Sequence, residues 1–161
     1  STLMRSSAAS DVYKRQIEDR VKGGCLRYTA CDGDTDMTRA QVMIVDFVGA
    51  LAYLYRYASW AYVGGGFTRL LHSVIEPAVY GIPVSFGPNI KRKVTPTEMV
   101  RIGIGQVVHD IDELDMWFKM LKSDKARTQY IAKRAGKYVK QNTGATPRVV
   151  QQILQTLCDR K

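Results

Sequence analysis

Short apolar runs alternate with stretches of helical spacing through the first two thirds of the chain. The runs have the length and composition of buried strands in a parallel sheet, and they lie at 25–30, 41–46, 60–63, 83–86 and 106–109. Apolar residues at helical spacing predict helices at 51–58, 69–80 and 97–102. This order predicts an α/β fold with a Rossmann-like, doubly wound parallel sheet, in which ligands lie beyond the carboxyl ends of the strands.

The last third of the chain predicts helices alone. Asp110 and Glu113 have the spacing of a capping box at the start of a helix to Leu121, and Ser123 is placed to cap the helix that follows. The final helix begins at Thr146-Pro147. Its predicted buried face consists of Val149, Val150, Ile153, Leu154 and Leu157.

The N-terminal segment differs from the rest. Residues 1–16 have no hydrophobic period and are rich in small polar residues. We therefore expect residues 1–20 to be a disordered or non-native tail, and residues 21–161 to form one Rossmann-like domain.

Composition places this chain among ordinary soluble proteins, with 45% apolar and 24% charged residues in 161. This length suffices for one domain or for half of a two-domain enzyme. No apolar run is long enough to cross a bilayer and no secretory signal is visible, which predicts the cytoplasm. Three cysteines without a CxxC spacing and two histidines predict neither a metal site nor a disulfide framework.

The net charge of +9 is concentrated at the C-terminal end. Residues 119–161 contain 11 basic and two acidic side chains, and so hold the whole excess. Their helical spacing favours a solvated helix face, with an anionic membrane surface as the alternative. No aromatic residues interleave the basic ones as a stacking platform for bases would require, so no nucleic-acid partner is expected.

Three glycines, Gly64, Gly65 and Gly66, end the strand at 60–63 and precede the predicted helix at 69–80. Free backbone N–H groups at the positive end of a helix suit a phosphate or another anion. The pattern is not a dinucleotide fingerprint, because Arg69 stands where the third glycine is required. A tight turn explains three glycines equally well, and on spacing alone both interpretations stay open.

A polar group follows on the same predicted helix. Glu76 lies four residues after His72 and three after Ser73, so all three can share one helix face. A carboxylate there can accept two hydrogen bonds from a ribose diol. The alternatives are a hydrogen-bonded core histidine at His72 and an exposed, solubilising Glu76.

Longer motifs around these residues resemble one family. They are Val63-Gly64-Gly65-Gly66-Phe67, His72-Ser73-Val74-Ile75-Glu76-Pro77-Ala78, Gly81-Ile82-Pro83-Val84 and Phe86-Gly87-Pro88-Asn89. Together they resemble the donor-domain signature of the 3-deoxy-D-manno-octulosonic acid (Kdo) transferases, over roughly residues 24 to 157. Ser73 stands where the family usually has asparagine.

The resemblance implies the C-terminal, nucleotide-sugar domain of a GT-B glycosyltransferase that uses no metal at the transfer step and no cofactor. Such enzymes move Kdo from CMP-Kdo to a lipid A precursor, in lipopolysaccharide biosynthesis on the cytoplasmic face of the bacterial inner membrane. It implies a donor phosphate at Gly64, Gly65 and Gly66, and a ribose at Glu76 with His72 and Ser73 beside it. Gly87 and Pro88 form the implied cytidine side, Asn89 is a further implied donor-binding residue, and Lys91 to Lys93 could meet an anionic donor or acceptor.

The resemblance also implies that the family's N-terminal domain is missing, with its acceptor site and its general-base glutamate. We therefore expect this chain alone to bind a nucleotide without turnover, and we assign no catalytic residue within it. Two alternatives remain: the donor domain of another GT-B nucleotide-sugar transferase, and a non-catalytic nucleotide-binding module.

Overall fold

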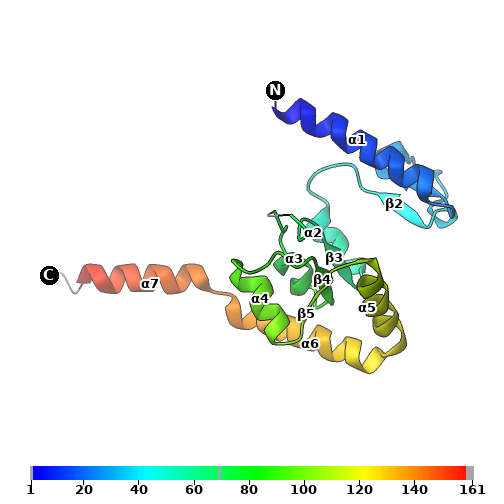
Figure 1. Ribbon diagram of the computed structural model, residues 1–161. Helices are drawn as coiled ribbons and strands as arrows, with labels where there is room; N and C mark the ends of the chain where they lie inside the picture. The colour runs from blue at the N-terminus through cyan, green and yellow to red at the C-terminus, as the bar shows by residue number, and fades with distance from the viewer. Residues whose placement is uncertain (1, 69, 159–161) are drawn as a thin grey trace. The chain divides into compact units, whose positions relative to one another are not determined.

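The structure is a computed structural model that describes residues 2–68 and 70–158 (Figure 1). It divides into two compact units, the first ending at Leu51 and the second beginning at Ala52. In these described ranges, no helix has both the length and the apolar character of a membrane span.

The first unit contains one long helix and one strand pair. Helix α1 (Thr2–Arg20) is followed by β1 (Cys25–Arg27), two 3₁₀ turns (Tyr28–Ala30 and Met37–Arg39) and β2 (Val42–Ile44). Strands β1 and β2 pair in parallel. The Arg27 guanidinium donates to the Glu18 carboxylate at 2.9 Å, which ties the end of α1 to β1.

Residues 2–20 are thus helical where the sequence predicts a disordered or non-native tail. The physical reason is composition, because leucine, methionine, arginine and alanine are good helix formers even without an apolar stripe. That the segment is foreign to the domain stays a prediction.

The second unit is built on a three-stranded parallel sheet. Strands β3 (Ala61–Val63), β4 (Val84–Phe86) and β5 (Gly105–Val107) lie in the order β3-β4-β5. The predicted parallel α/β fold is confirmed. A single sheet through all five strands is not what the structure contains, because β1 and β2 form their own sheet in the first unit.

Helices connect and follow these strands. The second unit contains the end of α2 (Leu51–Leu54), a 3₁₀ turn (Tyr55–Tyr57), α3 (Ile75–Val79), α4 (Val94–Arg101), α5 (Ile111–Ser123), α6 (Lys125–Asn142) and α7 (Ala145–Cys158). The helix predicted at 69–80 is wrong in extent, because α3 begins only at Ile75. Pro77 lacks a backbone donor and fits the first turn of a helix, whereas the His72 N–H donates to the Gly64 carbonyl instead of to a helical partner.

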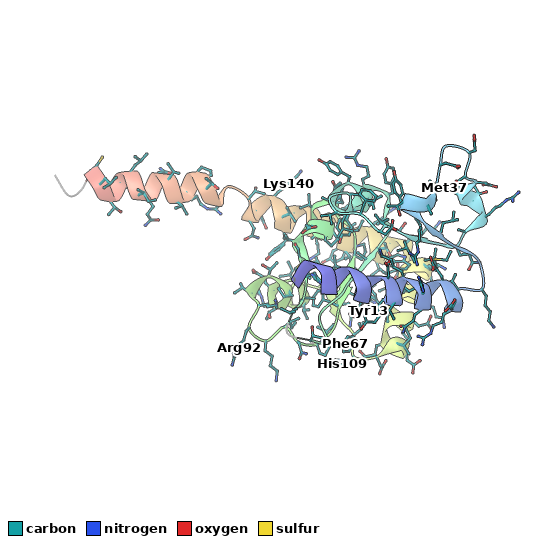
Figure 2. The ribbon with its side chains drawn as sticks, turned by 90° about the horizontal axis from the view of Figure 1, so that it is seen from above. Tyr13, Met37, Phe67, Arg92, His109 and Lys140 are labelled. Atoms are coloured by element: carbon teal, nitrogen blue, oxygen red, sulfur yellow. The ribbon has the colours of Figure 1, made fainter. Side chains whose placement is uncertain are left out.

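The core of the second unit surrounds the central strand β4. Val84, Ser85 and Phe86 are all fully buried, and Met99 of α4 and Ile104 before β5 are buried with them. By contrast, the side chains of Phe67 and Arg92 are exposed at the surface (Figure 2). The residues that follow β4 therefore extend from the most rigid part of the unit.

The last helix differs from its prediction. The five apolar residues of its predicted buried face are exposed to about half or more, from 48% for Val150 to 59% for Leu157. The amphipathic pattern of α7 predicts a buried face, but no described segment of this chain covers that face.

Two aspartates start the preceding helices. The Asp110 carboxylate accepts from the Glu113 N–H at 2.8 Å, as predicted for α5. For α6, the cap is Asp124, whose carboxylate accepts from the Arg127 N–H at 2.8 Å. The prediction of Ser123 as the cap is wrong, because α5 extends through Ser123.

Replacing Asp124 by alanine is expected to lower the free energy of unfolding by about 1 kcal/mol, because the first turn of α6 loses its side-chain acceptor. The matched variant Ser123→Ala is expected to change it by less than about 0.5 kcal/mol. Urea denaturation followed by circular dichroism measures both. An equal loss in the two variants would contradict this assignment.

Candidate functional site

The turn after β3 depends on Gly65. Its φ is +83°, in the left-handed region that glycine adopts without strain. A Cβ at this position would lie 2.7 Å from the carbonyl carbon of Leu70. The Gly65 carbonyl accepts from the Thr68 N–H at 3.1 Å, which closes the turn.

The turns after β3 and β4 meet at two glycines. A Cβ on Gly66 would lie 2.7 Å from the Cα of Gly87, and a Cβ on Gly87 would lie 2.7 Å from the Gly66 carbonyl oxygen. Asn89 bridges the same turns, because its N–H donates to the Gly66 carbonyl and its side-chain amide to the Phe67 carbonyl, both at 2.9 Å. The structure therefore brings together three predicted site residues, Gly66, Gly87 and Asn89, from two separate motifs.

His72 and Ser73 lie beside the glycine turn in an extended segment. The His72 N–H donates to the Gly64 carbonyl at 3.2 Å, and a Cβ on Gly64 would lie 4.0 Å from the His72 ring. Both His72 and Ser73 are exposed, so the alternative of a buried core histidine is excluded. Their predicted common helix face with Glu76 is wrong, because both precede α3.

A small hollow of about 170 Å³ opens next to this segment. Lys93 lines it, and its ammonium donates to the Leu71 carbonyl at 3.3 Å. The other lining residues are Leu71, His72, Ser73, Val74, Ile75, Thr95 and Pro96. An ammonium, an imidazole and a hydroxyl at one hollow are donors suited to an anion.

Glu76 lies further along, in the first turn of α3, and is half-buried. Burial raises the pKa of the nearby Tyr55 phenol, and the negative charge of Glu76 raises this pKa further. Glu76 does not line the hollow at His72. Its predicted role at a ribose stays a prediction.

Two features of the site could not be predicted from the sequence. The contact between Gly66 and Gly87 joins residues 21 positions apart and carries no local signal. Thr95 and Pro96 become walls of the hollow only because α4 begins beside the segment that carries His72. Within residues 2–68 and 70–158, no three histidine, cysteine or acidic side chains are grouped as metal ligands.

Comparison with known sequences identifies relatives of this chain. The chain is 32% identical over 117 residues to the 3-deoxy-D-manno-octulosonic acid transferase of Chlamydia muridarum, covering 71% of this chain and 27% of that protein. It is 27% identical over 124 residues to the transferase of the same name from Chlamydophila psittaci, covering 75% and 29%. The chain therefore spans less than a third of the length of these relatives. No protein-family model matches it.

A solved structure has the same fold. The C-terminal CMP-Kdo binding domain of WaaA from Acinetobacter baumannii superimposes with a TM-score of 0.61 at 23% identity, covering 71% of this chain and 60% of that one. This similarity confirms the fold, one half of a GT-B architecture. Together with the sequence relatives, it confirms the resemblance found in the motifs: the chain belongs to the Kdo transferase family, as a C-terminal domain.

Proposed function

We propose that this chain binds CMP-Kdo as the donor half of a glycosyltransferase. The observation that carries the proposal is the meeting of Gly66 and Gly87 at the carboxyl ends of β3 and β4. Ligands of α/β sheets bind at that end of the strands. Two backbones in contact, without side chains between them, leave a surface that a nucleotide can approach closely.

The proposed donor site consists of Gly64, Gly65, Gly66, His72, Ser73, Glu76, Gly87, Pro88 and Asn89. Lys93 adds a positive charge at the hollow beside His72. In the transfer step, negative charge grows on the CMP phosphate as it leaves. Donors fixed before the reaction stabilise this charge. We assign that role to Lys93, to His72 and to the backbone of the glycine turn.

The activity of the whole protein follows as part of this proposal. It would transfer Kdo to a lipid A precursor during lipopolysaccharide biosynthesis, at the cytoplasmic face of the bacterial inner membrane. The chain would supply the donor, and the acceptor would be bound by a second domain. The support is the name and activity class of the sequence relatives.

A second candidate is a GT-B domain for another nucleotide sugar. It is favoured by a match of 27% identity over 68% of this chain to a bifunctional glycosyltransferase/methyltransferase from Fusobacterium nucleatum. This candidate predicts binding of a different base, such as the uracil of UDP. Measuring which nucleotide binds more tightly therefore distinguishes the two candidates.

Calorimetric titration of the 161-residue chain with CMP, UDP and NAD tests the proposal. We expect CMP to bind most tightly. Replacing Lys93 by methionine is expected to weaken CMP binding by about tenfold, because a charge-assisted hydrogen bond contributes about 1.5–3 kcal/mol.

Lys122→Met is the matched control, because Lys122 is exposed and does not line the hollow. It is expected to leave the affinity for CMP within about twofold, since an exposed charge contributes little. Tighter binding of UDP would support the second candidate. Absence of nucleotide binding would overturn both.

A further inference from the structure

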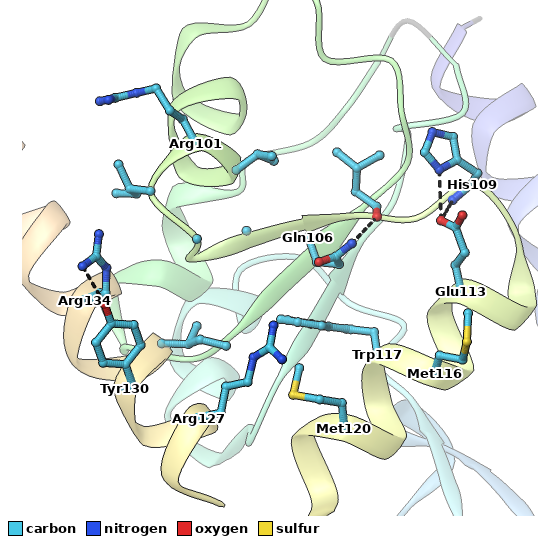
Figure 3. Close-up of a pocket in the computed structure, with 16 residues that line it drawn as sticks. Arg101, Gln106, His109, Glu113, Met116, Trp117, Met120, Arg127, Tyr130 and Arg134 are labelled. Carbon is cyan, nitrogen blue, oxygen red and sulfur yellow. Dashed lines mark hydrogen bonds and ion pairs between the residues drawn. The ribbon is translucent and has the colours of Figure 1, made fainter. Parts of the chain in front are cut away.

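A larger cavity lies away from the proposed donor site, along the outer edge of β5 (Figure 3). Its volume is about 930 Å³. Its walls come from the end of α4, from β5, and from the facing sides of α5 and α6. None of the proposed donor-site residues lines it.

The cavity is lined by three arginines. The Arg101 guanidinium is paired with Glu98 at 3.1 Å, and the Arg134 guanidinium donates to the Tyr130 hydroxyl at 2.8 Å. The Arg127 guanidinium has no ion pair or side-chain hydrogen bond within the described residues, and Figure 3 shows it reaching toward Trp117. One charge in this wall is therefore available to a ligand.

The single carboxylate of the lining does not neutralise these arginines. Glu113 accepts from the His109 N–H at 2.8 Å and contacts the His109 ring nitrogen at 2.9 Å. The hydrogen bond from the His109 side chain lowers the pKa of Glu113, and the bond from the His109 backbone lowers it further. The carboxylate thus stays engaged with His109 at one end of the cavity, and the arginine end keeps its positive potential.

A buried tryptophan, Trp117, forms part of the cavity wall. Its side chain is only 8% exposed and lines the cavity, and its Nε1 is buried without a hydrogen-bond partner within the described residues. A buried donor without an acceptor costs about 1–3 kcal/mol. The accessible part of Trp117 in the cavity is therefore its apolar ring surface and not the N–H.

The rest of the wall is apolar and adaptable. Met116 and Met120 of α5 and Ile131 of α6 line the cavity beside Trp117. Methionine side chains adjust to differently shaped apolar groups. A positive end and an apolar wall in one cavity match a ligand that is both charged and apolar.

The edge of β5 argues against a peptide strand as the occupant. The Val108 N–H donates to Phe86 of β4, so the neighbouring Val107 presents its backbone groups to the outer side. The Val107 carbonyl already accepts from the Gln106 side-chain amide at 2.7 Å (Figure 3). This side chain occupies the edge that an added strand would need.

We propose that this cavity binds an amphiphilic anion. Its phosphate or carboxylate pairs with Arg127, Arg134 adds positive charge to the same wall, and its apolar part packs on Trp117, Met120 and Ile131. Guanidinium groups suit such anions, because their planar donors can bond two oxygens at once. The site goes beyond the proposed donor function and shares no residue with it.

Fluorescence of Trp117 gives a direct test. The chain contains two tryptophans, and Trp60→Phe leaves Trp117 as the only one while keeping an aromatic ring against Phe118. This variant of the 161-residue chain is titrated with octyl phosphate, octanoate, inorganic phosphate and octanol. We expect a saturable change in Trp117 emission with octyl phosphate or octanoate, at least about tenfold tighter than with inorganic phosphate or octanol.

Adjacent residues of α6 supply the matched variants. Arg127→Gln is expected to weaken binding by about tenfold. Arg134→Gln is expected to weaken binding less, because the Arg134 guanidinium already donates to the Tyr130 hydroxyl. Lys133→Gln removes the same charge from the same helix outside the cavity, and is expected to change binding by less than twofold.

Three results would overturn the proposal: no change in emission, equal binding of octanol or inorganic phosphate, or equal effects of Lys133→Gln and Arg127→Gln. Because no nucleotide is used, a failure here is distinct from a failure to bind CMP. Circular dichroism of each variant confirms that the fold is retained.

Discussion

Replacing Gly66 by alanine is expected to lower the free energy of unfolding by about 3 kcal/mol and to abolish nucleotide binding. The new methyl group would lie 2.7 Å from the Cα of Gly87, a separation that atoms do not adopt. The atoms that this methyl group would meet belong to the backbone of Gly87 and not to a flexible side chain. The turns after β3 and β4 must therefore separate, and Asn89 loses the Gly66 carbonyl as its acceptor.

Gly64→Ala is the matched control within the same turn. A Cβ at Gly64 would meet only the His72 ring, at an ordinary contact distance of 4.0 Å. This variant is expected to cost less than about 1 kcal/mol. Urea denaturation followed by circular dichroism measures the stability, and calorimetry with CMP measures the binding. Equal losses of stability in the two variants would show that the contact of the turns is not what Gly66 preserves.

The largest loss of stability is expected for Phe86→Ala, at about 4 kcal/mol. Phe86 is fully buried at the end of the central strand, and its ring lies where a side chain on Gly105 would otherwise be. Removal of the ring leaves a cavity between β4 and β5. Because Gly87 follows directly, the proposed donor site is expected to lose its position together with the core.

Phe67→Ala is the control for this change, because the Phe67 ring is 52% exposed. Its removal is expected to change the free energy of unfolding by less than about 0.5 kcal/mol. Thermal unfolding and urea denaturation give both values. A loss at Phe86 no greater than that at Phe67 would contradict the described core.

Sequence reasoning was most accurate for the strands and the cap of α5. Each of the first four predicted strands contains an observed one, from β1 at Cys25–Arg27 to β4 at Val84–Phe86, and the strand predicted at 106–109 overlaps β5 at Gly105–Val107. Short runs of apolar residues have few alternatives in an α/β chain, because burial on both faces requires them to be continuous. The capping pair at Asp110 is equally local, since it needs only a side chain three residues before its donor.

Sequence predictions were wrong where two groups compete for one backbone N–H or for one cap position. The segment at His72 has the spacing of a helix, yet its N–H is taken by the Gly64 carbonyl. Ser123 is a good cap by type, but α5 continues through it and leaves the role to Asp124. The prediction of a buried face on α7 failed for another reason, because helical spacing predicts an apolar side and not the segment that covers it.

By itself, the sequence determined the approximate strand positions, the cap at Asp110 and the family, because each depends on residues close together along the chain. Only the tertiary structure decided that Gly66 meets Gly87, that the Lys93 ammonium donates to the Leu71 carbonyl, and that Trp117 lines one cavity together with three arginines. Those relations join distant residues through close packing, and packing depends on shape and direction that no local pattern contains.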